Sequence, residues 1–388
     1  MRLINLKNII AVLFCLLAGV FMASCGGGSS SVAQGSLSTQ LTDASSESYQ
    51  AVYVTISRVD VHADGGDGWQ TVANPDQTYN LLDLVNGVRE TLGIAVLNAG
   101  HYTQMRLILG GTPGSDVNIF SLPHPFANYV IDQDNTVQEL TVPSGMTTGL
   151  KIVNGFDINP DQTTELLLDF DAMHSVVMAG SSGKYQLKPT VKVLNVADGA
   201  IISGVVSEAG MTPPVLLDRA LVTAQVADPG NAEVADQVVI ESGTLSVLGD
   251  YALFLAADNY NLVAVKGGYL PTCAAVSLIP ASHETVEFAL DPVAAAPGSI
   301  TGSVSIGGAS ADQVVTIDVR QELTCEGALN PAVVTTRSIN VANGGGYDVT
   351  LPAGTYQVVA STFGKTTRAI DNVAVITAVA TDLGDLAF

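Results

Sequence analysis

Three aspartates in the first half of the chain are the residues best suited to carry chemistry. Asp169 and Asp171 alternate with apolar residues on one predicted strand, so their carboxylates share a face and lie about 7 Å apart. Together with Asp43 or Asp83 they could hold calcium, which binds six or more oxygen ligands. The same pair could act as the acid and the nucleophile of a glycosidase. The third interpretation, which we favour, is a solvated strand face that Lys188 or Lys192 neutralises.

Three lysines are predicted to share one face of the strand that closes the first domain. Lys184, Lys188 and Lys192 could bind a sulfated or uronic polysaccharide, or they could neutralise neighbouring carboxylates. Pro189 lies among them and indicates an edge strand or a bulge, because proline has no N–H to donate. Trp69, the only tryptophan, follows a glycine-rich turn. It could stack on a sugar, but we favour a position in the core.

Composition excludes several classes of function. The chain has 15 Lys and Arg residues against 37 Asp and Glu residues, a net charge of −22. A surface this acidic repels phosphate backbones, so nucleic acid is not an expected partner. The histidines lack the spacing of metal ligands, and the sequence has no nucleophile elbow, phosphate-binding loop or dinucleotide fingerprint. We therefore expect a protein that is not an enzyme and has no cofactor, with calcium as the one metal to consider.

The amino-terminal residues predict export and a lipid anchor. Arg2 and Lys7 precede an apolar run over residues 9–22, which is shorter than the roughly 20 residues of a membrane span. The run ends in FMASC, at residues 21–25, which resembles the lipobox of bacterial lipoproteins. The resemblance implies that residues 1–24 are a signal peptide, and that Cys25 becomes the lipidated first residue.

The residues that follow the cysteine agree with the same predicted location. Residues 25–35 are rich in Gly and Ser, which predicts a flexible tether after the lipidated cysteine. Gly26, rather than Asp, follows the cysteine, which resembles lipoproteins sorted to an outer membrane. The expected location is therefore the cell envelope, lipid-anchored at the outer membrane.

Two cysteines remain once Cys15 is removed with the signal and Cys25 carries lipid. An oxidising compartment permits a disulfide between Cys273 and Cys325, which would join the second and third domains. Closing a loop of about 50 residues would add roughly 4 kcal/mol of stability by the chain-entropy argument. Two buried free thiols are the alternative.

The rest of the chain predicts an all-β fold. Val, Ile, Thr and Gly dominate, and no long segment has helical periodicity. We expect three consecutive β-sandwich domains, over residues 36–197, 198–293 and 298–388. A strand over residues 51–62 slips by one residue at Ser57-Arg58, which predicts a β-bulge. Further strands of the first domain are expected over residues 36–41, 79–84, 102–109, 137–142, 150–158, 165–170 and 185–193.

The second and third domains look like copies of each other. ISG at residues 202–204 matches ITG at residues 300–302, and residues 294–297 form a short linker between the copies. An equally spaced set follows in each copy: Tyr251, Leu255, Tyr260 and Gly268, then Tyr347, Leu351, Tyr356 and Gly364. This pattern resembles the carboxypeptidase-regulatory-like, transthyretin-type β-sandwich.

The first domain has a more specific likeness. LTDA at residues 41–44 and AVYVTI at residues 51–56 resemble the start of a bacterial lipoprotein family called domain of unknown function 4382. The match continues through LLDL at residues 81–84 and ends with LKPTVKV at residues 187–193. The family implies cell-surface lipoproteins and brings no established activity or catalytic residues.

These observations favour a non-enzymatic lipoprotein of the cell surface that serves as a binding or structural module. The tandem sandwiches would form a stiff stalk or an assembly module, and the first domain would make the contact. One alternative is a carbohydrate-binding module that assists polysaccharide use or attachment. Another is a hydrolase that uses Asp169 and Asp171. The expected partners are the membrane, through the lipid anchor, and a polysaccharide or a surface protein.

Overall fold

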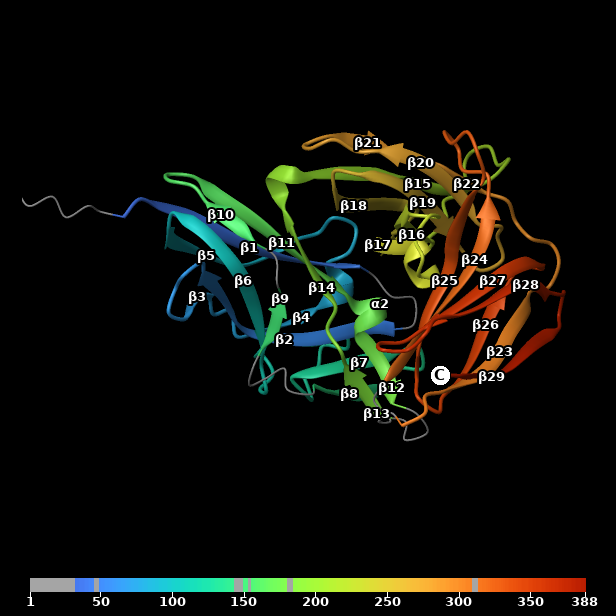
Figure 1. Ribbon diagram of the computed structural model, residues 1–388, viewed down its shortest axis with the longest axis horizontal. Coiled ribbons are helices and arrows are strands. Elements are labelled where there is room, and N and C mark those ends of the chain that lie inside the picture. The colour runs from blue at the N-terminus through green and yellow to red at the C-terminus, as the bar shows by residue number, and fades with distance from the viewer. Residues whose placement is uncertain (1–31, 45–48, 143–148, 153–154, 180–183, 309–312) are drawn as a thin grey trace, which may run out of the picture.

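The computed structural model describes residues 32–44, 49–142, 149–152, 155–179, 184–308 and 313–388. Cys25 and residues 26–31 lie outside these ranges. The described chain folds into six β-sheets with few helical residues (Figure 1), so the predicted all-β class is confirmed. Within these ranges no helix has the length and apolar character needed to cross a membrane.

Residues 34–195 form the first unit, which has a four-stranded and a ten-stranded sheet. The smaller sheet has the order β14-β11-β1-β5 and contains β1 (Gln34–Ala44), β5 (Glu90–Asn98), β11 (Thr163–Asp171) and β14 (Val191–Asn195). The larger sheet has the order β10-β6-β2-β7-β8-β13-β12, with β3 and β4 beside β2 and β9 beside β6. Its strands are β2 (Tyr49–Ala63), β3 (Trp69–Ala73), β4 (Gln77–Asn80), β6 (Gly100–Leu109), β7 (Asn128–Asp132), β8 (Val137–Thr141), β9 (Leu150–Ile152), β10 (Phe156–Ile158), β12 (Val176–Ala179) and β13 (Lys184–Leu187).

The bulge predicted in β2 is confirmed. The register between β2 and β6 shifts between Ile56 and Arg58. Ile56 before the shift and Val59 and Val61 after it are all fully buried in one core cluster. The extra residue therefore restores the inward face that strict alternation would have lost.

The single strand predicted over residues 185–193 is wrong. β13 ends at Leu187 and pairs with β12 and β8 in the larger sheet, whereas β14 begins at Val191 and pairs with β11 in the smaller one. Pro189 lies in the connection, where it need not donate a ladder hydrogen bond. The chain thus crosses from one sheet to the other at the proline.

The second and third units each consist of two facing sheets. In the second unit the sheets have the orders β18-β15-β21, with β22 beside β15, and β17-β16-β19-β20. Its strands are β15 (Gly199–Glu208), β16 (Leu221–Ala227), β17 (Val238–Leu245), β18 (Asp250–Ala256), β19 (Asn259–Val265), β20 (Thr272–Ser277), β21 (His283–Thr285) and β22 (Phe288–Leu290). In the third unit the orders are β26-β23-β29 and β25-β24-β27-β28. Its strands are β23 (Gly298–Ser305), β24 (Val314–Leu323), β25 (Ala332–Ala342), β26 (Gly346–Leu351), β27 (Gly354–Ser361), β28 (Arg368–Val375) and β29 (Ala380–Ala387).

The residues that repeat in sequence occupy equivalent places in the two units. Gly204 of β15 lies opposite Tyr251 of β18, and Gly302 of β23 lies opposite Tyr347 of β26. A Cβ atom on Gly204 would collide with the carbonyl oxygen of Val286. A Cβ atom on Gly302 would lie 2.5 Å from the hydroxyl oxygen of Tyr347. Close packing, rather than a special backbone angle, therefore requires glycine at both places: against the Val286 backbone at Gly204 and against the Tyr347 side chain at Gly302.

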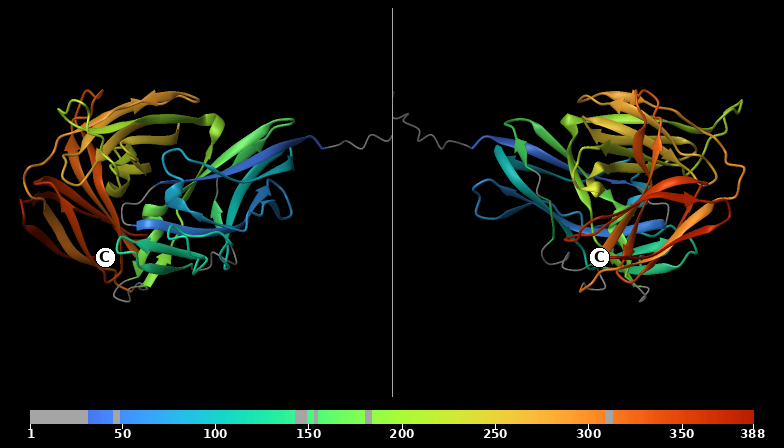
Figure 2. Two further views of the ribbon diagram at one scale, coloured as in Figure 1. Left: turned by 180° about the vertical axis from the view of Figure 1, so that it is seen from behind. Right: turned by 45° about the vertical axis from the view of Figure 1, so that its right-hand side comes forward.

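The three units touch one another in pairs (Figures 1 and 2). Each pair is joined by side-chain hydrogen bonds: Ser242 to Asp169, His174 to Ser338, and Gln225 to Thr335. The third unit folds back onto the first, since β12 and the short helix α2 (Ala172–Ser175) lie against β25. The stalk predicted from sequence is wrong, because the chain forms a closed three-part body.

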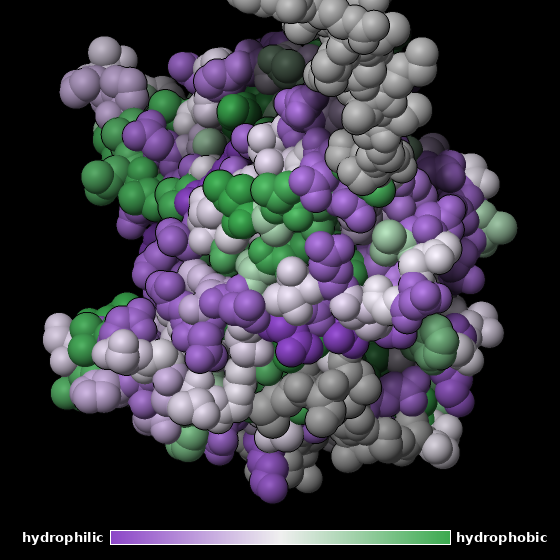
Figure 3. Space-filling model, turned by 90° about the vertical axis from the view of Figure 1, so that its left-hand side faces the viewer, coloured by the Kyte–Doolittle hydropathy of each residue, from purple (hydrophilic) through white to green (hydrophobic). Residues whose placement is uncertain are grey.

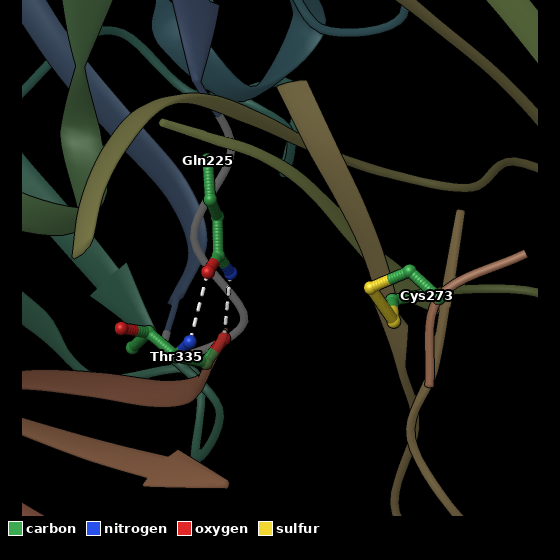
Figure 4. Close-up of a disulfide and its surroundings, with 4 residues drawn as sticks. Gln225, Cys273 and Thr335 are labelled. Carbon is green, nitrogen blue, oxygen red and sulfur yellow. Dashed lines mark hydrogen bonds between the residues drawn. A yellow bond between two sulfur atoms is a disulfide. The ribbon is translucent and has the colours of Figure 1, made fainter. Parts of the chain in front are cut away.

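The second and third units are joined most firmly (Figure 4). Cys273 of β20 and Cys325, which follows β24, form a disulfide across a sequence separation of 52 residues. Both cysteines lie in a buried cluster with Val263 and Val334, so the bridge is part of a small core shared by the two units. The buried guanidinium of Arg320 adds hydrogen bonds to carbonyl oxygens of residues 234, 235 and 238.

Candidate functional site

The aspartates singled out in the sequence lie at the junction of the three units. Asp169 of β11 is buried and accepts a hydrogen bond from Ser242 of the second unit, at 3.1 Å. Asp171 pairs with His174 at 2.6 Å, and the other nitrogen of that ring contacts Ser338 of the third unit. The solvated strand face predicted for Asp169 is therefore wrong, because the second unit covers it.

The same aspartates do not meet the geometry expected for calcium. Thr42, not Asp43, lies opposite Asp169 in the parallel pairing of β1 and β11. Asp43 instead accepts a hydrogen bond from the backbone N–H of Ala172. Across the described ranges, no group of three or more His, Cys, Asp or Glu side chains is arranged to hold a metal ion.

Burial sets the protonation of these carboxylates. It raises the pKa of Asp169 to about 7, helped by the charge of Asp171, while Ser242 and Lys192 act in the opposite direction. Burial also raises the pKa of Asp43 well above its ordinary value. Asp43 Oδ2 and Asp169 Oδ1 accept no hydrogen bond from the described residues. A carboxyl buried beneath the second unit is closed to a substrate, which favours a structural role for Asp169 over that of a nucleophile.

The predicted lysine stripe is not formed. Lys184 lies on β13 and Lys192 on β14, in different sheets, and Lys188 lies in the connection between them. Lys192 Nζ reaches the second unit, where it lies 2.7 Å from both the carboxylate and the backbone carbonyl oxygen of Glu241. This lysine therefore joins two units instead of offering a free cation to a ligand.

Trp69 lies on the outer face of the larger sheet and is half-buried, so the core position favoured from sequence is wrong. The cause is the pairing of β2 with β3. Trp69 lies opposite His62, and the neighbouring Val61 points into the core. The Arg106 guanidinium carbon lies 4.4 Å from the centre of the indole ring, and Lys151 Nζ lies 5.9 Å from it. The indole thus has two cations within cation–π range.

A buried carboxylate, that of Asp60, pairs with two of the cations on this face. Asp60 is 1% exposed and accepts from Arg58 at 3.1 Å, from Arg106 at 2.8 Å and from Thr71 at 2.8 Å. These contacts fix the two guanidinium groups, while 41% of the Arg58 side chain stays exposed. We call Trp69, His62, Arg58, Arg106 and Lys151 the Trp69 face.

Sequence reasoning missed most of the Trp69 face. Asp60 stands between the buried Val59 and Val61, so alternation places it outward, but nothing local indicates that arginines from two strands would bury it. Arg106 and Lys151 are cross-strand partners on β6 and β9, and they are 45 positions apart in sequence. Only the order of the strands brings them beside Trp69.

A second exposed surface lies in the loop between β6 and β7. The side chains of five large apolar residues in this loop are 36–57% exposed: Val117, Ile119, Phe120, Leu122 and Phe126. The loop is held from beneath, because the Asn118 side chain accepts from two backbone N–H groups and His124 contacts the Tyr129 hydroxyl at 2.7 Å. We call these five side chains the apolar loop.

Comparison with known proteins shows a likeness between the first unit and one family model. Residues 34–189 match the family model described as "Domain of unknown function (DUF4382)". The match begins with β1 and ends just before β14, and it leaves the second and third units outside. No curated protein matches the chain.

Several solved structures share weak likeness with the chain. The Bacillus anthracis TIE protein is 11% identical with a TM-score of 0.20, over 91% of this chain and 50% of its own, so this chain spans half its length. A streptococcal ancillary pilin is 11% identical with a TM-score of 0.20, over 90% of this chain and 98% of its own. The shaft pilin of Lactobacillus rhamnosus GG is 8% identical with a TM-score of 0.20, over 49% of this chain and 96% of its own. At these TM-scores neither the arrangement nor the role of those proteins carries over to this chain.

Proposed function

We propose that this chain is a non-enzymatic binding protein of the bacterial cell surface, anchored through Cys25, and that it binds acidic polysaccharide through the Trp69 face. One observation carries the proposal. In a protein with 37 acidic and only 15 basic residues, two arginines and a lysine gather around the single tryptophan on an outer sheet face.

The chemistry of this face fits an acidic sugar. A half-buried indole offers apolar surface to a pyranose ring, and guanidinium groups pair well with carboxylate and sulfate. The arginines are held in place by Asp60 before any ligand arrives, so little side-chain entropy is lost on binding.

The anchor would bring this face close to the cell envelope. Eight residues, 26–33, separate Cys25 from β1, and they reach at most about 28 Å when extended. β1 begins at the left-hand end of Figure 1, and Figure 3 views that end, where hydrophobic patches are set among hydrophilic side chains. The backbone N–H of Ala99, next to the start of β6, donates to the carbonyl oxygen of Ala33, so the start of β6 lies beside the residue that precedes β1.

The second and third units would brace the first rather than extend it. Lys192, Asp169 and His174 of the first unit all contact them. Such contacts hold the binding face at a fixed orientation, in place of the stalk expected from sequence.

Binding of the full chain to a panel of acidic and neutral polysaccharides, at two ionic strengths and with and without calcium, tests the proposal. We expect saturable binding to one sulfated or uronic polymer that weakens as salt rises. Trp69→Ala should weaken it at least tenfold and Lys151→Gln several-fold. The control, Lys365→Gln, removes an exposed lysine of the third unit and should have no effect. Unchanged binding by Trp69→Ala would rule out this face.

A second candidate function, contact with a surface protein, is supported by the apolar loop. Its five side chains stay exposed although the loop is firmly held, a pattern typical of protein interaction sites. If no polysaccharide binds, cross-linking of the native protein in its membrane, compared with a Phe120→Ser variant, becomes the deciding experiment.

A further inference from the structure

A small cavity lies between the second and third units, away from the Trp69 face. Its volume is about 140 Å³. One wall comes from residues 265–271 of the second unit, and the other from β25, β26 and β27 of the third. Residues 293–297, which connect the two units, supply the remaining side. Ligand pockets commonly form at such boundaries between domains.

The cavity is lined mainly by apolar and aromatic side chains. On the second-unit side these are Val265, Tyr269 and Pro271, and on the third-unit side Leu351, Pro352 and Tyr356. An engineered cavity of about 150 Å³ with an apolar lining binds benzene. A single six-membered ring is therefore the largest rigid group that the cavity would enclose.

The charged groups at the cavity all have one sign. Lys266 and Arg337 line it, and none of the described lining residues is Asp or Glu, although acids outnumber bases in the chain by 37 to 15. Lys266 donates to the backbone carbonyl oxygen of Asp218, and Arg337 donates to that of Thr336. Among the described residues neither cation has a carboxylate within ion-pair distance. Arg337 donates to a residue of the cavity lining, so its positive charge lies at the cavity and remains available to an anion, whereas the Lys266 ammonium group is held at Asp218, outside that lining.

The walls are held in place without a ligand. The disulfide between Cys273 and Cys325 joins the two units, and Gln225 binds the backbone of Thr335, next to Thr336 and Arg337 of the cavity lining. The Tyr356 hydroxyl donates a hydrogen bond to the carbonyl oxygen of Pro352, and this bond fixes the aromatic ring in the wall. Because the pocket is formed before a ligand binds, little conformational entropy is lost on binding.

We propose that this cavity binds a small ring-bearing carboxylate of about the size of benzoate. The ring would lie between the apolar walls, and the carboxylate would pair with the Arg337 guanidinium. Because its walls belong to two units, occupancy would also strengthen the junction between them.

Calorimetric titration of the full chain with benzoate, and with its neutral and cationic counterparts benzamide and benzylamine, tests the proposal. We expect benzoate to bind with a dissociation constant below about 1 mM, at least tenfold more tightly than either counterpart. Arg337→Gln should weaken the binding of benzoate about tenfold. Arg368→Gln is the matched control, because this third-unit arginine also donates to a carbonyl oxygen but lies outside the cavity lining, and it should leave binding unchanged.

A second variant keeps the test decisive if Arg337→Gln unfolds. Ala295→Trp, in the connection between units, would place an indole at the cavity and should abolish benzoate binding while the chain still unfolds cooperatively. Three results would overturn the proposal: no saturable benzoate binding up to 10 mM, equal affinity for benzamide, or undiminished binding by folded Ala295→Trp protein.

Discussion

The side-chain amide of Gln225, on β16, pairs with the backbone of Thr335, on β25, through two hydrogen bonds. Nε2 donates to the Thr335 carbonyl oxygen at 2.6 Å, and Oε1 accepts from the Thr335 N–H at 2.8 Å (Figure 4). Gln225 is fully buried, and it satisfies the N–H and the carbonyl oxygen of one residue of another unit, as the backbone of a neighbouring strand would within a sheet.

Gln225→Leu should destabilise the junction by roughly 2–4 kcal/mol, because it leaves a buried N–H and a buried carbonyl of Thr335 without partners. Urea unfolding followed by a probe in the third unit measures the loss. Gln357→Leu is the matched control, since the Gln357 side chain donates to the exposed Asp371, and this substitution should cost less than about 0.5 kcal/mol. Equal effects of the two substitutions would contradict a special role for Gln225.

The disulfide gives a second prediction. Replacing Cys273 and Cys325 by serine should lower the stability of the second and third units by about 4 kcal/mol, because the unfolded chain gains the freedom of a 52-residue loop. Chemical unfolding with and without a reducing agent measures this. The reducing agent should lower the free energy of unfolding of the native protein and leave that of the double serine variant unchanged. Alkylation of both cysteines in unreduced native protein would show that the bridge is absent.

The two repeats provide a matched pair of tyrosines. The Tyr251 hydroxyl donates to the Val286 carbonyl oxygen at 2.7 Å, whereas the Tyr347 hydroxyl is buried with no partner among the described residues. Tyr251→Phe should therefore destabilise its unit by about 1 kcal/mol, and Tyr347→Phe should be neutral or stabilising. Thermal unfolding of both variants distinguishes them, and equal losses would contradict the difference in hydrogen bonding.

The raised pKa of Asp169 predicts that the stability of the junction between the first and second units depends on pH. Its pKa in the folded protein is raised to about 7 from an ordinary value of 3.8, mainly by burial. Between pH 4 and pH 7 the folded state holds a proton that the unfolded state has released, so this group lowers stability as pH rises through that window. Asp169→Asn removes the dependence.

The difference in unfolding free energy between Asp169→Asn and the native protein should shift by up to about 4 kcal/mol in favour of the variant from pH 4 to pH 8. Urea unfolding at a series of pH values measures it. Asp157→Asn is the control, because that exposed carboxylate pairs with His101 at the surface and should give a much smaller shift. A constant difference across the series would mean that Asp169 titrates normally.

The lipid anchor gives a further prediction. Cys25→Ala should release the protein from the membrane fraction and abolish acylation, because no other residue of the lipobox supplies a thiol. Fractionation and mass spectrometry of the amino-terminal peptide check this. Membrane association that persists in the variant would contradict the lipoprotein prediction.

Local patterns in the sequence were sufficient for the fold class and for some details. Alternation with period 2 predicts the strands, and its interruption at Ser57-Arg58 predicts the bulge, because both depend only on which neighbours along the chain share a face. The repeated spacing of glycine and tyrosine predicts equivalent places in the last two units, where Gly204 and Gly302 each lie opposite a tyrosine.

Contacts between units were not predictable in this way. The side chains of Asp169, Lys192 and Trp69 all point outward from their own sheet. Residue type alone favours solvent for the two charged residues and the core for the tryptophan. The second unit covers Asp169 and binds Lys192, while no unit covers Trp69. Whether an outward side chain meets water or protein depends on surfaces brought together from distant parts of the chain, and no local periodicity encodes that packing.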